Sequence, residues 1–140
     1  MYVRQGSRAT RRGLAAAETA IVIPVFLTIV FGMIEMARMC FVSHLITTAA
    51  SSGCRVATIG NHSQADITTT VSTLLVAGGI RSSSSYTVTT IPADVTTAHF
   101  GTPISVKITV PFAKVSWLGV PRYLKTTTLI AESTMSSERP

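Results

Sequence analysis

The sequence GLAAAE at residues 13–18 opens an apolar run that continues to Ile34 and carries one formal charge, the carboxylate of Glu18. A basic segment with four arginines, residues 1–13, precedes this run. In a helix the run spans about 31 Å, the thickness of a bilayer's hydrocarbon core. We therefore expect residues 14–36 to form a transmembrane helix with its basic side in the cytoplasm. A buried core helix is the alternative, but 140 residues leave little other core to surround one.

The carboxylate of Glu18 is costly inside a membrane, by about 2.5 to 3.5 kcal/mol near the bilayer centre. If the chain were cut after Gly13, Leu14 would carry a free ammonium group one helical turn away from Glu18. The two groups could then neutralise each other, within one subunit or between neighbouring subunits. In the alternative, Glu18 simply occupies a helix N-terminus, where the macrodipole favours an acid. The spacing alone leaves both interpretations open.

Three blocks of sequence resemble a known family: residues 11–24 (RRGLAAAETAIVIP), 31–38 (FGMIEMAR) and 49–57 (AASSGCRVA). The first block has a basic pair before Gly13 and an acid five residues later, and resembles the leader-peptidase site of type IV prepilins. The blocks in register resemble the TadE-like proteins, which are pseudopilins or minor pilins of the bacterial tight-adherence (Tad/Flp) pilus system. The chain departs from the family pattern at Thr19, where an aromatic residue is common.

The resemblance implies a structural subunit, not an enzyme, for assembly of a Tad/Flp-type pilus used in adhesion or secretion. It implies a leader, residues 1–13, that a prepilin peptidase removes by cutting between Gly13 and Leu14. It also implies a single-pass protein of the bacterial inner membrane, with a cytoplasmic N-terminus and with residues 37–140 forming an extracytoplasmic head. The implied partners are the peptidase, other pilin subunits, the pilus assembly machinery and the membrane. The alternatives are an uncleaved single-pass membrane-anchored interaction module and a type II secretion pseudopilin.

Three further residues are candidate assembly residues beside Glu18. Pro24 lacks a backbone donor, so we expect it to interrupt and kink the first helix. Glu35 and Arg38 form an i,i+3 pair at the expected exit from the membrane. We interpret this pair as solvated at the interface; a register-setting contact with another pilin is the alternative.

The pattern predicts an α+β fold with a long N-terminal membrane-spanning helix, a second short helix and a small three-stranded antiparallel sheet. The first helix is expected from Leu14 to about Gly60. The second is expected over residues 64–77, with Ser63 and Asp66 as its cap. Strands are expected over residues 86–91, 104–110 and 126 to about 135, because β-prone residues there alternate between apolar and polar.

The first helix becomes amphipathic beyond Arg38. Apolar and small residues recur there at the a/d spacing of a heptad, which predicts a stripe that packs on the sheet. The residues of this predicted stripe are Val42, Leu45, Ala49, Ser52, Val56 and Ile59.

The connection over residues 111–125 is unusually apolar for a loop. Trp117, Leu118 and Tyr123 lie among basic residues, a composition that suits a membrane interface or a partner surface. In the alternative, the connection folds back to complete a small core.

The sequence offers no recognisable catalytic, metal, cofactor or nucleic-acid site. The three histidines lack metal-ligand spacing, and no phosphate-binding or dinucleotide-binding glycine pattern occurs. The net charge is +6, but four of the twelve basic residues lie in residues 1–13, so the rest of the chain is close to +2 and no nucleic-acid partner is expected. Cys40 and Cys54 would lie about 21 Å apart on one helix, too far for a disulfide within the chain. We expect both to be free and buried, with pairing between subunits as the alternative; at Cys54 the TadE-like family commonly has a small residue.

Overall fold

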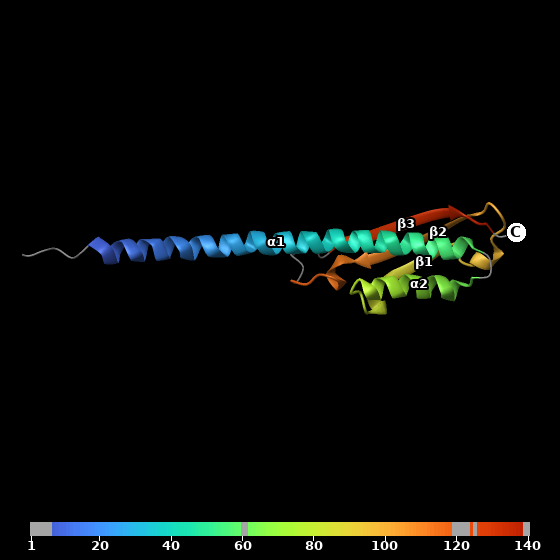
Figure 1. Cartoon of the computed structure of the whole chain (residues 1–140), viewed down its shortest axis with the longest axis horizontal. Helices are drawn as coiled ribbons and strands as arrows, with labels where there is room; N and C mark the ends of the chain where they lie inside the picture. Colours follow the sequence, from blue (N-terminus) through green and yellow to red (C-terminus); the bar gives the residue numbers. More distant parts are fainter. Residues whose placement is uncertain (1–6, 60–61, 119–123, 125, 139–140) are drawn as a thin grey trace, which may run out of the picture. The chain divides into compact units, whose positions relative to one another are not determined.

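The computed structural model describes residues 7–59, 62–118, 124 and 126–138, with side chains from Ala15 onward. It divides into two compact units, the N-terminal unit Met1–Met36 and the head Ala37–Pro140. The described elements are α1 (Ser7–Thr58), α2 (Gln64–Ala77), η1 (Ser83–Ser85), β1 (Thr87–Ile91), η2 (Val95–Thr97), β2 (Pro103–Pro111), η3 (Phe112–Lys114) and β3 (Thr128–Ser136) (Figure 1). The α+β prediction, with its long apolar helix, short second helix and antiparallel strands, is confirmed.

Helix α1 begins earlier than expected, at Ser7 and not at Leu14. The expected start of the helix at Leu14 is therefore wrong, because residues 7–13 of the expected leader are helical as well. Alanine and arginine are good helix formers, and a helix that has already nucleated extends at little further cost. The predicted interruption at Pro24 is also absent, because Pro24 lies inside a helix that continues across it.

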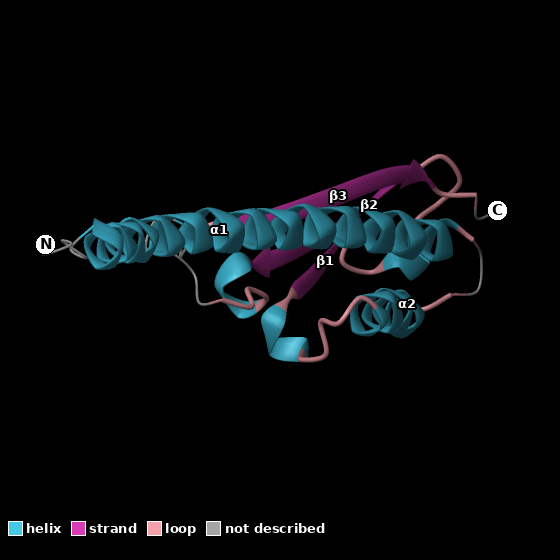
Figure 2. Ribbon diagram, turned by 60° about the vertical axis from the view of Figure 1, so that its left-hand side comes forward, coloured by secondary structure: helices cyan, strands magenta, loops and turns pink. Residues whose placement is uncertain are grey.

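The head is built on an antiparallel sheet of order β1-β2-β3. Opposite residues such as Val88 and Ile108, or Ile108 and Ala131, set its register. The apolar face of β2 is fully buried, as its alternating sequence predicts: Ile104, Val106, Ile108 and Val110. The part of α1 in the head and α2 contribute to the same hydrophobic clusters as these residues, so the two helices cover one face of the sheet (Figure 2).

The packing of α1 on the sheet is confirmed, but its buried face is not quite the predicted stripe. Leu45, Ser52 and Val56 are half-buried, and Ile59 is exposed. The a/d pattern repeats every 3.5 residues, whereas a straight helix turns every 3.6, so the two diverge by about 20° per heptad. The residues that α1 buries in the head core are Val42, Ile46, Ala49, Ala50, Cys54 and Ala57.

Helix α2 has the predicted bounds and the predicted cap. The backbone N–H of Ser63 donates to Oδ2 of Asp66 over 2.8 Å, and the Ser63 hydroxyl donates to the same oxygen over 3.0 Å. These two bonds stabilise the ionised carboxylate and lower the pKa of Asp66. Helix α2 packs closely on α1, since a Cβ atom at Gly53 would lie only 2.7 Å from Cγ2 of Val71.

Candidate functional site

The predicted cleavage site, Gly13–Leu14, lies within the helical backbone of α1, about two turns from its start. The side chains of these two residues lie outside the description. A peptidase must reach an extended backbone, so the first turns of α1 must open before this bond can be cut. Gly13 lowers that barrier, because glycine in a helix is about 1 kcal/mol less favourable than alanine.

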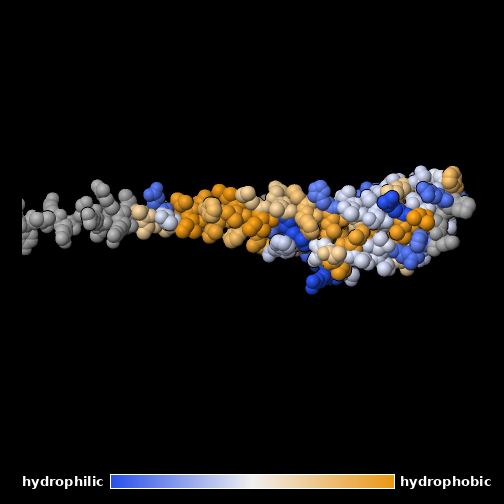
Figure 3. Space-filling model, in the orientation of Figure 1, coloured by the Kyte–Doolittle hydropathy of each residue, from blue (hydrophilic) through white to orange (hydrophobic). Residues whose placement is uncertain are grey.

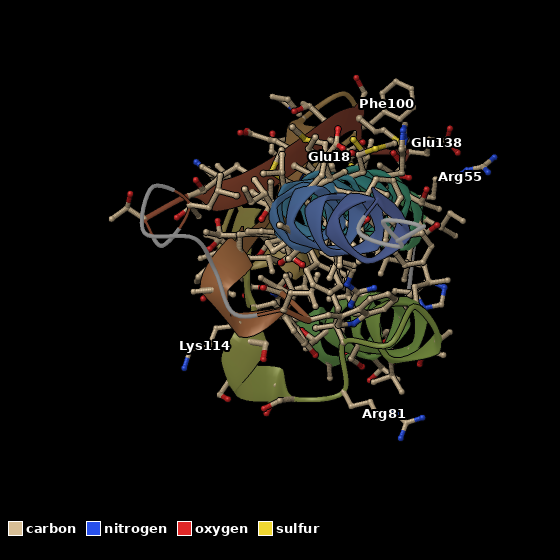
Figure 4. The ribbon with its side chains drawn as sticks, turned by 90° about the vertical axis from the view of Figure 1, so that its left-hand side faces the viewer. Glu18, Arg55, Arg81, Phe100, Lys114 and Glu138 are labelled. Carbon is tan, nitrogen blue, oxygen red and sulfur yellow. The ribbon has the colours of Figure 1, made fainter. Side chains whose placement is uncertain are left out.

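The side chain of Glu18 is exposed and points outward from α1 (Figure 4). It follows Leu14 by four residues, which is about one helical turn. The first turn of α1 contains no acidic residue, so Glu18 is not a helix-start acid in the intact chain. The macrodipole alternative is therefore wrong for the uncut protein. A chain that began at Leu14 would instead place its terminal amine and this carboxylate on the same first turn.

The N-terminal unit exposes nearly all of its large apolar side chains. Figure 3 shows these residues in orange along α1. Five of them line a shallow, open groove on the helix surface: Ile21, Val22, Val25, Phe26 and Ile29. Among the described residues, one helix, α1, is long enough and apolar enough to cross a membrane. This finding fits a single-pass anchor.

The polar side chains among these apolar residues have partners on α1 itself. The hydroxyl of Thr19 donates to the carbonyl of Ala15, and that of Thr28 donates to the carbonyl of Pro24, each over 2.8 Å. Such i−4 bonds satisfy the hydroxyl donors without water. This part of α1 therefore presents an apolar surface on which the hydroxyls of Thr19 and Thr28 are already hydrogen-bonded. Glu18 is the acidic residue of this surface.

The interpretation of Glu35 and Arg38 as a solvated pair is wrong. Glu35 is 4% exposed and Arg38 is 7% exposed, and no ion pair between them occurs among the described residues. The Nε–H of Arg38 donates to the carbonyl of Val115 over 3.2 Å. Both carboxylate oxygens of Glu35 are buried and have no hydrogen-bond partner within the described part of the chain. Arg38 thus links the segment after β2 to α1, while Glu35 makes no such hydrogen bond within the described residues.

The described part of the connection after β2 is buried at some positions and exposed at others. Phe112 and Val115 are buried and complete the head core, whereas Trp117 is 69% exposed and Leu118 is exposed as well. The Trp117 ring centroid lies 4.7 Å from Cζ of Arg38.

The arginine also reaches a ring on its own helix. The centroid of the Phe41 ring lies 5.5 Å from Cζ of Arg38. Sequence reasoning missed Phe41, although its i,i+3 spacing from Arg38 on a helix was visible. Tyr123, the third aromatic or apolar residue predicted for this surface, lies outside the described residues.

The two cysteines are both free, as expected, but only one is buried. Cys54 is enclosed in the head core, where its thiol donates to the carbonyl of Ile104 over 3.3 Å. Burial raises the pKa of the Cys54 thiol and keeps it neutral and unreactive. Cys40 is exposed, contrary to expectation. No group of three or more potential metal-ligating side chains occurs among the described residues.

Comparison with protein families matches residues 13–55 to the family described as TadE-like protein. This is the family that the three sequence blocks resemble, so the resemblance is confirmed for this stretch. The match covers less than half of the chain and includes the apolar run, Glu18 and the first buried turns of the head. It indicates a Tad pilus-associated protein of a structural kind. No curated protein and no solved structure was found to match the chain.

Proposed function

We propose that the chain is a minor pilin or pseudopilin that takes part in assembling a Tad/Flp-type pilus for adhesion or secretion, and that it is not an enzyme. The observation that carries the proposal is the exposed apolar surface of α1 within the segment that matches the TadE-like family. An apolar helix surface of this size needs a covering of lipid or of other helices. A subunit that starts in the inner membrane and then joins a bundle of similar helices uses both coverings in turn.

In this mechanism the first half of α1 leaves lipid for the interior of a helix bundle. Rows of side chains spaced four residues apart, such as Ile21, Val25 and Ile29, form the ridges that pack between neighbouring helices. The internally bonded hydroxyls of Thr19 and Thr28 allow this transfer without leaving donors unpaired.

Glu18 supplies the charge that makes a cut chain assemble. After cleavage by the prepilin peptidase, the new amine of Leu14 would be buried in the bundle, where an isolated ammonium is very costly. The Glu18 carboxylate lies one turn away and is exposed, so it is free to pair with the amine of its own or a neighbouring subunit.

Glu35 and Pro24 are the second pair of assembly residues in the proposal. A buried carboxylate is costly when its oxygens lack hydrogen bonds, as those of Glu35 do within the described residues. We therefore expect a rearrangement on assembly to bring Glu35 a cationic or donor group from a neighbouring subunit. Arg38 is held by Val115 in the head and fixes the level at which that contact forms. Pro24 frees one backbone carbonyl of α1, an acceptor for a neighbouring helix.

Mass spectrometry of the N-terminus tests the proposal. In cells with an active prepilin peptidase, the proposal expects a mature chain that begins at Leu14 and is recovered with the pilus fraction. Matched cells that lack the peptidase should yield a chain that begins at Met1 and stays in the inner membrane. An intact Met1 in both cell types would contradict the proposal and favour the uncleaved anchored module. A chain that begins at Leu14 but leaves the membrane without the Tad assembly machinery would favour a type II secretion pseudopilin.

A further inference from the structure

We propose that an exposed patch on the head binds the phosphate-bearing headgroup layer of the membrane that α1 crosses. This basal patch consists of Phe41, Trp117 and Leu118, with Arg38 against the two rings and Lys114 three residues before Trp117 in the sequence. The inference rests on the membrane-spanning part of the proposed function and is independent of leader processing.

Hydrogen bonds hold the backbone that leads into the basal patch, although the rings of the patch are exposed. The N–H of Phe112 donates to the carbonyl of Thr127 over 2.9 Å, and the N–H groups of Val115 and Ser116 both donate to the carbonyl of Phe112 over 3.0 Å. These bonds and the buried Phe112 fix the backbone just before Trp117. A tryptophan that is fixed in position yet 69% exposed is not needed for the head core, so its surface is available to an external partner.

Position along α1 identifies that partner as the membrane. Arg38 follows Ile34, the last residue of the apolar run, by four positions, and Phe41 follows it by seven. These separations correspond to about 6 and 10 Å of helix. The headgroup layer on each side of a hydrocarbon core is roughly 5 to 8 Å thick. When residues 14–34 span the core, Arg38 therefore lies within the headgroup layer. The backbone of Phe41 lies just beyond this layer, and a helix side chain tilts back toward the N-terminus and thus toward the layer.

The fold of the head brings Trp117 to the same level as Arg38. Strand β2 starts beside the distal end of α1, where the carbonyl of Ile104 accepts a hydrogen bond from Cys54. The chain after β2 reaches Val115, whose carbonyl accepts a hydrogen bond from Arg38 at the start of the head. The chain thus returns along α1 toward the start of the head before it reaches Trp117. Phe100, an exposed ring that precedes β2, belongs to the opposite end of the strand.

The chemistry of the basal patch fits a lipid interface better than a soluble partner. Tryptophan is enriched at headgroup depth, where its apolar ring meets the acyl chains and its polar edge stays hydrated. Lysine and arginine near an anionic leaflet are attracted to lipid phosphates, and the Lys114 side chain extends outward from the head (Figure 4). The anchor also holds the patch against this surface at a high effective concentration, which a soluble protein would not have.

Depth-dependent fluorescence quenching tests the inference, because Trp117 is the only tryptophan of the chain. The full chain is placed in phosphatidylglycerol vesicles that contain lipids with a quencher either near the headgroup or near the bilayer centre. The shallow label should quench Trp117 about twofold more than the deep label does. Two single-tryptophan variants provide the scale: Trp117→Phe with Phe26→Trp should be quenched most by the deep label, and Trp117→Phe with Phe100→Trp by neither.

The outcomes of this experiment separate the membrane-docking inference from the membrane span of α1. A quenched Phe26→Trp reporter with an unquenched Trp117 overturns the membrane-docking inference and leaves the membrane span intact. An unquenched Phe26→Trp reporter overturns the span, and with it the proposed function. The charge reversal Lys114→Glu should reduce shallow quenching of Trp117 severalfold in phosphatidylglycerol vesicles, whereas the matched reversal Arg55→Glu, near the distal end of α1, should not. Equal effects of the two reversals would contradict headgroup binding by the basal patch.

Discussion

Helix α1 carries the same kinds of residues in its two halves, but the structure treats them in opposite ways. In the N-terminal unit Ile29 is 58% exposed, whereas in the head Ile46 has no exposed surface. The head half of α1 finds its apolar partners on α2 and the sheet of the same chain. Among the residues that the structure describes, the N-terminal half has no comparable partners, so its apolar side chains need a covering from outside these residues. The comparison teaches that one helix can form a folding core in one half and present an exposed apolar surface in the other, with the change between the two near residue 36.

The largest expected effect is a difference in head stability between variants of Ile46 and of Ile29. Ile46→Ala should destabilise the head by about 2 to 5 kcal/mol, because it leaves a cavity in a packed core. Ile29→Ala should leave the head's stability nearly unchanged, because Ile29 contributes nothing to that core. Chemical unfolding of the full chain in detergent micelles, followed by Trp117 fluorescence, measures both variants. Similar losses for the two would break the comparison.

A charge placed in the N-terminal half of α1, compared with the same charge placed in the head, gives the next largest effect. Val25→Lys should oppose membrane insertion by about 2.5 to 3.5 kcal/mol if it lies near the bilayer centre. Ile130→Lys introduces the same charge at an exposed position of β3 in the head and should not affect insertion. Membrane fractionation of cells that express each variant measures the result. Equal recovery of Val25→Lys and the parent in the membrane fraction would show that this half of α1 does not need an apolar setting.

The smallest effect concerns the cap of α2. Asp66→Ala should lower the stability of the head at neutral pH, because it removes the acceptor for the N–H and hydroxyl of Ser63. The pKa of Asp66 is lowered in the folded head, so its contribution is fully present above the ordinary pKa of an aspartate and disappears as the pH falls through the lowered value. Unfolding of parent and variant across acidic pH should show the two converging. A constant difference would contradict this origin of the effect.

The sequence predicted the elements of the head well, because local signals define them. The alternation from Ile104 to Val110 requires a strand with one apolar face, and Ser63 with Asp66 marks a helix start without any long-range information. The exposed apolar run and its acid were also visible, because a membrane span depends on composition and length.

Contacts between distant segments were what the sequence could not predict. The sequence places an acid about one turn before Arg38, yet the Nε–H of Arg38 donates to the carbonyl of Val115, 77 residues later. The buried face of α1 differs from the predicted stripe, because it depends on the actual pitch of the helix where it packs on the sheet. The division of the connection after β2 into a buried Phe112 and an exposed Trp117 likewise depends on how much core remained to be filled.

Pilus recovery of a Glu18→Gln variant tests the central claim most directly, that the N-terminal half of α1 finds its partners in an assembly in which Glu18 neutralises a new amine. The variant is isosteric, so the account predicts normal membrane insertion and cleavage before Leu14. It also predicts roughly tenfold less of the protein in sheared pili, since a charge-assisted hydrogen bond contributes about 1.5 to 3 kcal/mol. Glu132→Gln, which removes an exposed acid from β3, is the matched control and should assemble as the parent does. Recovery of Glu18→Gln at the parent's level would contradict the account.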